Sequence, residues 1–315
     1  MGIIEERQQI YNLIRENCNV FNDRGIFFNI NIDDRLLSQL QRAFVEYIHK
    51  TLLSFYGKKI FLADWRFDEC DFDFLNVYEQ EIFALPNISP NGVFYPKREN
   101  LKEYNKLQAI VTDILIDTGL INYISHAQCI TPRIVSGRSE EVMRSRLLAT
   151  EKYHSDAWAS QLGDSILSIP VGGDPTTTVE LCEPVDPSPD FFSSLTDYDD
   201  AYKKSFFKSL KFLDFAHFGA INIFDHACVH RTLKQGGGSR VSLEIGLAIK
   251  DGRSIFQKSK SFVYEQYRNK YLPQRDVSRL GKTLHINVQE TLDDAKNYKN
   301  KNFPRSRDEF EFVEV

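Results

Sequence analysis

Two histidines and one aspartate stand in sequence contexts that suit metal binding. His154 and Asp156 lie in the segment YHSDAW, directly after a predicted strand. Side chains two residues apart on extended backbone point to the same face, so this imidazole and this carboxylate are expected to lie side by side. The third residue, His230, lies much further along, in VHRTLKQGGGSRVS. Two neutral imidazoles and one carboxylate are good ligands for a divalent metal ion.

An arginine and a serine follow His230 on the next predicted strand. Arg240 comes ten residues after His230, and Ser242 shares its strand face. Arginine offers a fork of N–H donors that matches a carboxylate, and serine adds a hydroxyl group. Because a buried arginine is costly without an anionic partner, an arginine in this apolar strand indicates a bound acid. The two imidazoles and the carboxylate would leave open positions on an octahedral iron, as non-haem Fe(II) oxygenases require.

This combination of HxD, a distant histidine and Arg-x-Ser resembles the Fe(II)/2-oxoglutarate-dependent dioxygenases. In that resemblance His154, Asp156 and His230 match the iron ligands. Arg240 matches the arginine that pairs with the C5 carboxylate of 2-oxoglutarate, and Ser242 matches its hydroxyl helper. The resemblance implies Fe(II), 2-oxoglutarate and O2 as cofactor and cosubstrates. The tryptophan after HSD and the HRT segment look like the branch with phytanoyl-hydroxylase-like and antibiotic-pathway oxygenases.

The carboxylate narrows the implied reaction. Halogenases related to this family replace it with alanine or glycine, whereas this chain keeps Asp156. The resemblance therefore implies a hydroxylase, acting on a small polar metabolite or sugar-like biosynthetic intermediate with release of succinate and CO2. Desaturation, epimerisation and cyclisation stay open. A cupin-like metal hydrolase or isomerase is an alternative, but it gives Arg240 no role. A non-catalytic jelly-roll module that binds sugars is another.

Four further residues are candidates for the same site. Thr232 follows the distal histidine and is expected to bind 2-oxoglutarate. Trp158 either closes over the cofactor or packs in the core. Arg133 and Arg146, on strands before the HxD motif, are candidates for a substrate carboxylate or phosphate. The alternative for both arginines is an ordinary surface salt bridge.

Two other histidines are weaker candidates for a role in the site. His226 lies four residues before His230, but its spacing of fourteen to Arg240 exceeds the family's usual eight to ten. We therefore assign the distal ligand to His230 and expect a supporting or surface role for His226. His217, in the segment FAHF, is expected to be a core or rim residue.

The hydrophobic pattern predicts a run of short strands, as in a sandwich or small barrel, with helical segments on either side. The resemblance implies that 1–315 is one domain around a double-stranded β-helix core, so the expected fold class is mainly β with flanking helices, of the jelly-roll, cupin-like kind. Region 1–127 reads as mainly helical, with helices over 4–17, from Asp33–Asp34 to about 56, and over 101–118, where Gly119 ends the last. Seven core strands are expected, over 129–135, 145–153, 165–171, 177–182, 212–218, 220–224 and 240–249.

The connections between these elements complete the prediction. Glycine clusters at 172–173 and 236–238 read as hairpin turns. The core spans 128–250 and contains an insertion at 190–210, with a helix starting near Tyr198. A helix over 257–271 and a charged tail make up the C-terminal region, 251–315.

Composition bounds the class of protein. The 315 residues are 42% hydrophobic and 26% charged, which excludes collagen-like, coiled-coil and mainly disordered chains. A net charge of −5 argues against a nucleic-acid partner. Five cysteines without a CxxC pair are read as reduced thiols. With no signal-peptide pattern and no apolar run of about 18 residues, we expect a cytoplasmic protein without membrane contact.

Overall fold

The computed structural model describes most of the core and of the N-terminal region. The described residues are 2–57, 72–89, 92–94, 100–127, 130–137, 150–159, 165–188, 191, 203–204, 206, 209–249 and 272–273. Several predicted features lie outside them: most of the strand 145–153, the helix near Tyr198, the helix 257–271 and the charged tail.

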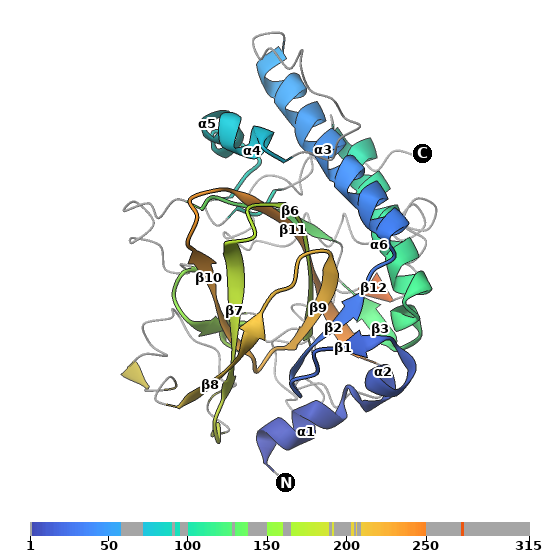
Figure 1. Cartoon of the computed structure of the whole chain (residues 1–315), viewed down its shortest axis with the longest axis vertical. Helices are drawn as coiled ribbons and strands as arrows, with labels where there is room; N and C mark the ends of the chain where they lie inside the picture. Colours follow the sequence, from blue (N-terminus) through green and yellow to red (C-terminus); the bar gives the residue numbers. More distant parts are fainter. Residues whose placement is uncertain are drawn as a thin grey trace, which may run out of the picture.

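Two antiparallel sheets form the core (Figure 1). The eight-stranded sheet runs in the order β1 (Val20–Phe21), β2 (Phe27–Asn31), β9 (Ala220–Asp225), β6 (Ser165–Gly173), β11 (Arg240–Ile249), β3 (Ile124–Ala127) and β12 (Leu272–Pro273), with β4 (Thr131–Val135) also pairing with β11. The four-stranded sheet runs β5 (His154–Ser155), β10 (Val229–Lys234), β7 (Thr177–Pro184) and β8 (Leu210–Phe215). This arrangement of two antiparallel sheets with flanking helices confirms the predicted fold class, mainly β with flanking helices.

Two long helices cover the outer face of the larger sheet. α3 (Asp34–Tyr56) and α6 (Leu101–Asp117) lie side by side there (Figure 1). Asp33 caps α3 by accepting hydrogen bonds from two backbone N–H groups of its first turn. Gly119, with φ of 73°, follows α6 and adopts the left-handed backbone that ends many helices. Both helix predictions are confirmed.

The side chains of β11 alternate between two environments: the hydrophobic cluster under the helices and the space between the two sheets. Val241, Leu243 and Ile245 are buried in the hydrophobic cluster beneath the helices. Because strand side chains alternate, Arg240, Ser242 and Glu244 point the other way, toward the smaller sheet. The space between the sheets is partly filled by an apolar cluster that joins both of them, including Phe27, Phe224, Leu181 and Val179.

The N-terminal region contributes strands as well as helices. β2 pairs with β9 and is therefore an integral strand of the larger sheet. Sequence analysis did not include it, because region 1–127 was predicted to be mainly helical. The predicted helix 4–17 is two helices, α1 (Ile3–Gln9) and α2 (Asn12–Asn17). Two short helices, α4 (Phe74–Val77) and α5 (Glu79–Phe83), lie in the segment predicted as irregular.

The two glycine clusters are not hairpin turns, contrary to the prediction. Each lies where the chain crosses from one sheet to the other: β6 and β7 belong to different sheets, and so do β10 and β11. The crossings pack on each other, because the Asp174 carboxylate accepts a 3.0 Å hydrogen bond from the Gly238 N–H. Gly173 needs its glycine, since its φ is 94° and a Cβ would lie 2.3 Å from the Ser239 carbonyl oxygen.

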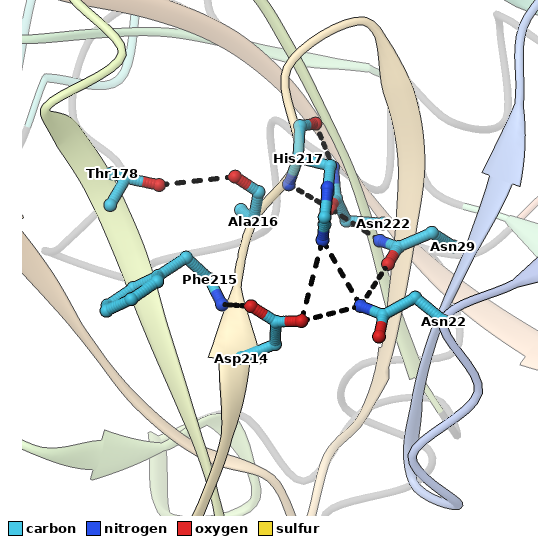
Figure 2. Close-up of polar contacts among 8 residues, drawn as sticks. All are labelled: Asn22, Asn29, Thr178, Asp214, Phe215, Ala216, His217 and Asn222. Atoms are coloured by element: carbon cyan, nitrogen blue, oxygen red, sulfur yellow. Dashed lines mark hydrogen bonds and ion pairs between the residues drawn. The ribbon is translucent and has the colours of Figure 1, made fainter.

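A polar network joins the two sheets at the edge where β8 approaches β2 and β9 (Figure 2). The Asn22 side-chain amide donates to Asp214 at 2.8 Å and lies 3.2 Å from Nε2 of His217. Asn222 is fully buried, accepts from the His217 N–H at 2.7 Å and from the Asn29 amide at 2.8 Å. These contacts satisfy polar groups that the sheet edge would otherwise leave unpaired.

Across the described part of the chain, no helix has both the length and the apolar character that a membrane span needs. The cysteines described there, Cys18, Cys182 and Cys228, are buried and carry no disulfide.

Candidate metal centre

Three predicted ligands lie together at one end of the smaller sheet. His154 on β5 is the direct cross-strand neighbour of His230 on β10. Asp156 begins the short helix α7 (Asp156–Ala159), so it reaches the site from a helix start instead of the extended backbone that we predicted. One ligand atom from each residue lies within 4.8 Å of the others. The His230 Nε2 and the Asp156 Oδ2 are 3.8 Å apart.

The protonation states of these groups suit a metal ion. Burial and the neighbouring His230 lower the pKa of His154 to about 3, so its imidazole is neutral at pH 7. Burial opposes the charged form of Asp156, but the nearby imidazoles of His230 and His154 outweigh it and lower the pKa of this carboxyl. The set therefore offers the imidazoles of His154 and His230 and the carboxylate of Asp156, the donor combination typical of non-haem iron sites.

Backbone carbonyls orient both imidazoles. The His154 Nδ1 lies 2.8 Å from the Lys152 carbonyl oxygen, and the His230 Nδ1 lies 3.3 Å from that of Cys228. A carbonyl only accepts hydrogen bonds, so Nδ1 is the protonated nitrogen in each ring. This tautomer leaves Nε2 as the ligand atom on both histidines.

A buried positive charge lies on the inner face of β11, next to a buried serine hydroxyl. Arg240 is 1% exposed and Ser242 is fully buried. The Arg240 Nε and Nη1 and the Ser242 Oγ have no hydrogen-bond partner among the described residues. Burial lowers the pKa of Arg240 to about 10, so the guanidinium is still charged at pH 7. A buried cation with unpaired donors is costly, and an acidic ligand would satisfy it.

Arg133 adds a second arginine to this inner face. It lies opposite Ser242 in the paired strands β4 and β11, on the same inner face. Its guanidinium forms a 2.9 Å ion pair with Glu244, and both side chains are mostly buried. Arg133 contributes to the lowered pKa values of both His154 and Arg240, which places its charge near each of them. A surface salt bridge, the alternative considered for Arg133, does not describe this pair.

The other predicted site residues have mixed outcomes. Thr232 is buried and lies two residues after His230 on the same face of β10. Trp158 is fully buried and its ring packs against Phe191 at 5.3 Å, in a cluster with Val229 on the opposite face of β10. These contacts match the packing alternative for Trp158. Arg146 lies outside the described residues.

His226 is close to the ligands without belonging to the group that can hold a metal ion. It is 1% exposed, and neither ring nitrogen has a hydrogen-bond partner among the residues described. Burial lowers its pKa to about 4, while Asp156 raises it. Its backbone carbonyl accepts hydrogen bonds from the Ser155 hydroxyl and the Ala157 N–H. His217, by contrast, belongs to the edge network of Figure 2.

Sequence reasoning missed two acidic residues that form ion pairs with arginines. Glu244 was detectable, because it lies two residues after Ser242 and so shares the inner face of β11. Asp225 was not, because its ion-pair partner Arg7 is 218 residues away in the sequence.

Comparisons with known proteins give structural neighbours only. No family model and no curated protein matches the sequence. A non-haem α-ketoglutarate-dependent carbocyclase, SnoK from nogalamycin biosynthesis, is 11% identical, with a TM-score of 0.42 over 77% of this chain and 83% of that one. AviO1 from Streptomyces viridochromogenes Tue57 is 13% identical, with a TM-score of 0.39 over 79% and 96%.

A prolyl 4-hydroxylase structure from Phytophthora capsici is 12% identical, with a TM-score of 0.36 over 95% of this chain and 84% of that one. Because the similarity is low, the chain's own side chains carry the functional assignment.

Proposed function

We propose that the protein is a non-haem Fe(II)- and 2-oxoglutarate-dependent oxygenase that acts on a small molecule. One observation carries the proposal: the buried Arg240, with unpaired donors, faces the same interior as His154, Asp156 and His230. A metal site alone would need no buried cation beside it. A site that takes a metal and a dicarboxylic acid together needs both.

The residues present fit this pair of ligands. His154, Asp156 and His230 would hold the iron, since their donor set is of the right kind. Arg240 and Ser242 would hold the distal carboxylate of 2-oxoglutarate through the donors that lack partners within the described chain. When bound, iron and 2-oxoglutarate supply the oxidation by O2 that releases succinate and CO2. The chain's own part is to position these groups and to exclude water from the space between the sheets.

Because the proposal requires iron and 2-oxoglutarate to bind together, it can be tested against the two rival functions. A cupin-like hydrolase or isomerase would use the same ligands but leaves Arg240 without a role. A sugar-binding module would need neither stoichiometric iron nor a keto acid. Both alternatives predict that 2-oxoglutarate does not alter the spectrum of the iron-loaded protein.

The test is an anaerobic titration with Fe(II) followed by 2-oxoglutarate. We expect a weak visible charge-transfer band that needs both additions. His154→Ala or His230→Ala should abolish the band, and Arg240→Ala should shift its appearance to much higher 2-oxoglutarate concentration. His217→Ala is the matched control, because His217 lies in the edge network and should leave the band unchanged. A band that survives all three site variants would contradict the proposal.

For the substrate we propose a small polar or sugar-like biosynthetic intermediate, with hydroxylation as the reaction. Arg133, already paired with Glu244, is the candidate contact for a polar or anionic substrate group. An untargeted metabolite screen with the iron-loaded protein should reveal a mass gain of one oxygen atom. A loss of two hydrogen atoms instead would indicate desaturation or ring closure.

We further propose that 1–315 is a single domain. Support comes from β2, which belongs to the N-terminal region yet pairs along its length with β9 of the core. Limited proteolysis should then yield no stable fragment that lacks the N-terminal region.

A further inference from the structure

A buried ion pair connects the N-terminal helix to the end of β9. Arg7 of α1 and Asp225 are 5% and 0% exposed. The Arg7 Nε donates to both carboxylate oxygens of Asp225 at 3.0 Å, and its Nη2 lies 2.9 Å from Oδ2. The Tyr11 hydroxyl donates to the same Oδ2 at 2.6 Å. Every charged hydrogen bond of this kind gains strength where water is excluded.

Asp225 also shapes the turn that leads to the distal metal ligand. Its carboxylate accepts a 2.8 Å hydrogen bond from the Ala227 N–H, and its carbonyl accepts one from the Cys228 N–H, also at 2.8 Å. These bonds define the turn from β9 into β10, two residues before His230. The position of His230 therefore depends on the conformation of a turn that Asp225 holds.

The same turn contacts neighbours of the other two ligands. The carbonyl of His226, inside the turn, accepts hydrogen bonds from the Ser155 hydroxyl and from the Ala157 N–H at 3.4 Å. Ser155 and Ala157 flank Asp156, and Ser155 directly follows His154. The turn that leads to His230 thus also contacts the segment that carries His154 and Asp156, from a distant part of the chain.

We propose that Arg7 and Asp225 are positioning residues for the metal centre, with Tyr11 as their helper. The inference rests on the proposed function only in that the His-Asp-His group must bind a metal. Contacts behind the ligands commonly change metal affinity about 10- to 100-fold when they are removed. Arg7, on the N-terminal helix, would therefore set the affinity and geometry of a metal that it does not touch.

The test uses Co(II) as the only ligand, because its visible spectrum reports coordination geometry. We expect Arg7→Met to weaken Co(II) binding by about tenfold and to alter the visible bands. Arg7→Lys keeps the charge but loses the two-pronged geometry, so it should bind with intermediate affinity. The thermal unfolding curve of each metal-free variant is measured first, so that the Co(II) titration is carried out at a temperature at which that variant is folded. If Arg7→Met does not fold, Arg7→Lys alone decides.

The matched control is Asp23→Asn beside Asp225→Asn. Both substitutions break one arginine–aspartate pair of the N-terminal helices, since Arg15 lies 2.9 Å from Asp23. Only Asp225 belongs to the metal-ligand turn. We expect Asp225→Asn to weaken Co(II) binding and Asp23→Asn to leave it unchanged.

Two results would overturn the inference while leaving the metal site itself intact. One is wild-type affinity and spectrum in a folded Arg7 variant, and the other is an equal loss of affinity in Asp23→Asn. Failure of wild type to bind Co(II) would overturn it together with the metal site. If wild type binds Co(II) but the iron protein gives no 2-oxoglutarate-dependent band, only the proposed oxygenase function fails.

Discussion

The guanidinium of Arg133 lies 2.9 Å from the carboxylate of Glu244, within the space between the two sheets. Arg240, on the same inner face, has no ion pair among the described residues, and two of its nitrogens lack any hydrogen-bond partner there. The pairing therefore distinguishes two neighbouring arginines. Glu244 forms its ion pair with Arg133, and under the proposed function Arg240 would be the arginine that binds the acid.

Glu244→Gln should strengthen the binding of 2-oxoglutarate. Without the carboxylate, Arg133 adds a second uncompensated positive charge near the acid. We expect the dissociation constant to fall by a factor of about five, which corresponds to about 1 kcal/mol of added attraction. The titration of the charge-transfer band measures this. Glu180→Gln is the control, because it breaks the 2.7 Å pair with Arg231 on the opposite face of β10. Weaker binding in Glu244→Gln would contradict the prediction and would show that the intact Arg133–Glu244 pair favours binding of the acid.

Arg240→Met should stabilise the protein without ligand and remove its response to 2-oxoglutarate. Replacing a buried, unpaired cation by an apolar side chain of similar length often raises stability by about 1 kcal/mol or more. Thermal unfolding should show a higher midpoint for the unliganded variant. Adding 2-oxoglutarate to the metal-loaded protein should raise the midpoint of wild type only. An equal rise in the variant would exclude Arg240 as the anchor.

Acid should destabilise the metal-free protein partly through His226. Burial lowers the folded-state pKa of His226 to about 4 from an ordinary value of 6.5. As pH falls below 6.5, the unfolded chain takes up this proton first, so unfolding is favoured until the pH reaches about 4. The full effect is on the order of 3 kcal/mol. His226→Leu should therefore flatten the dependence of unfolding free energy on pH over this window, and parallel curves would contradict the prediction.

The edge network of Figure 2 should matter for stability and not for metal binding. Asn222→Ala leaves several buried partners unpaired, among them the Asn29 amide and the His217 N–H. We expect a loss of about 2–4 kcal/mol in urea unfolding, with unchanged Co(II) affinity per folded molecule. The less buried Asn22→Ala should cost about 1 kcal/mol. Loss of metal affinity in the folded Asn222 variant would connect this edge to the metal centre.

Local spacing made much of the site predictable. Arg240 and Ser242 are two residues apart, and the period of a strand places them on one face. His154 and Asp156 are also two residues apart and lie together, although Asp156 begins α7 instead of continuing the strand. The helix α3 was readable for the same reason, since its apolar residues recur at helical spacing after a capping aspartate. These features depend on neighbours within a few residues, and such patterns are visible in any single sequence.

The sequence by itself thus determined which side chains could bind a metal and an acid, and which segments could form the helices and most of the core strands. Only the tertiary structure decided that β2 joins the main sheet, that Glu244 pairs with Arg133, and that Arg7 pairs with Asp225 at the end of β9. The physical reason is that these contacts depend on how distant segments pack. A hydrogen bond between Arg7 and Asp225 leaves no periodic trace in the residues around either one.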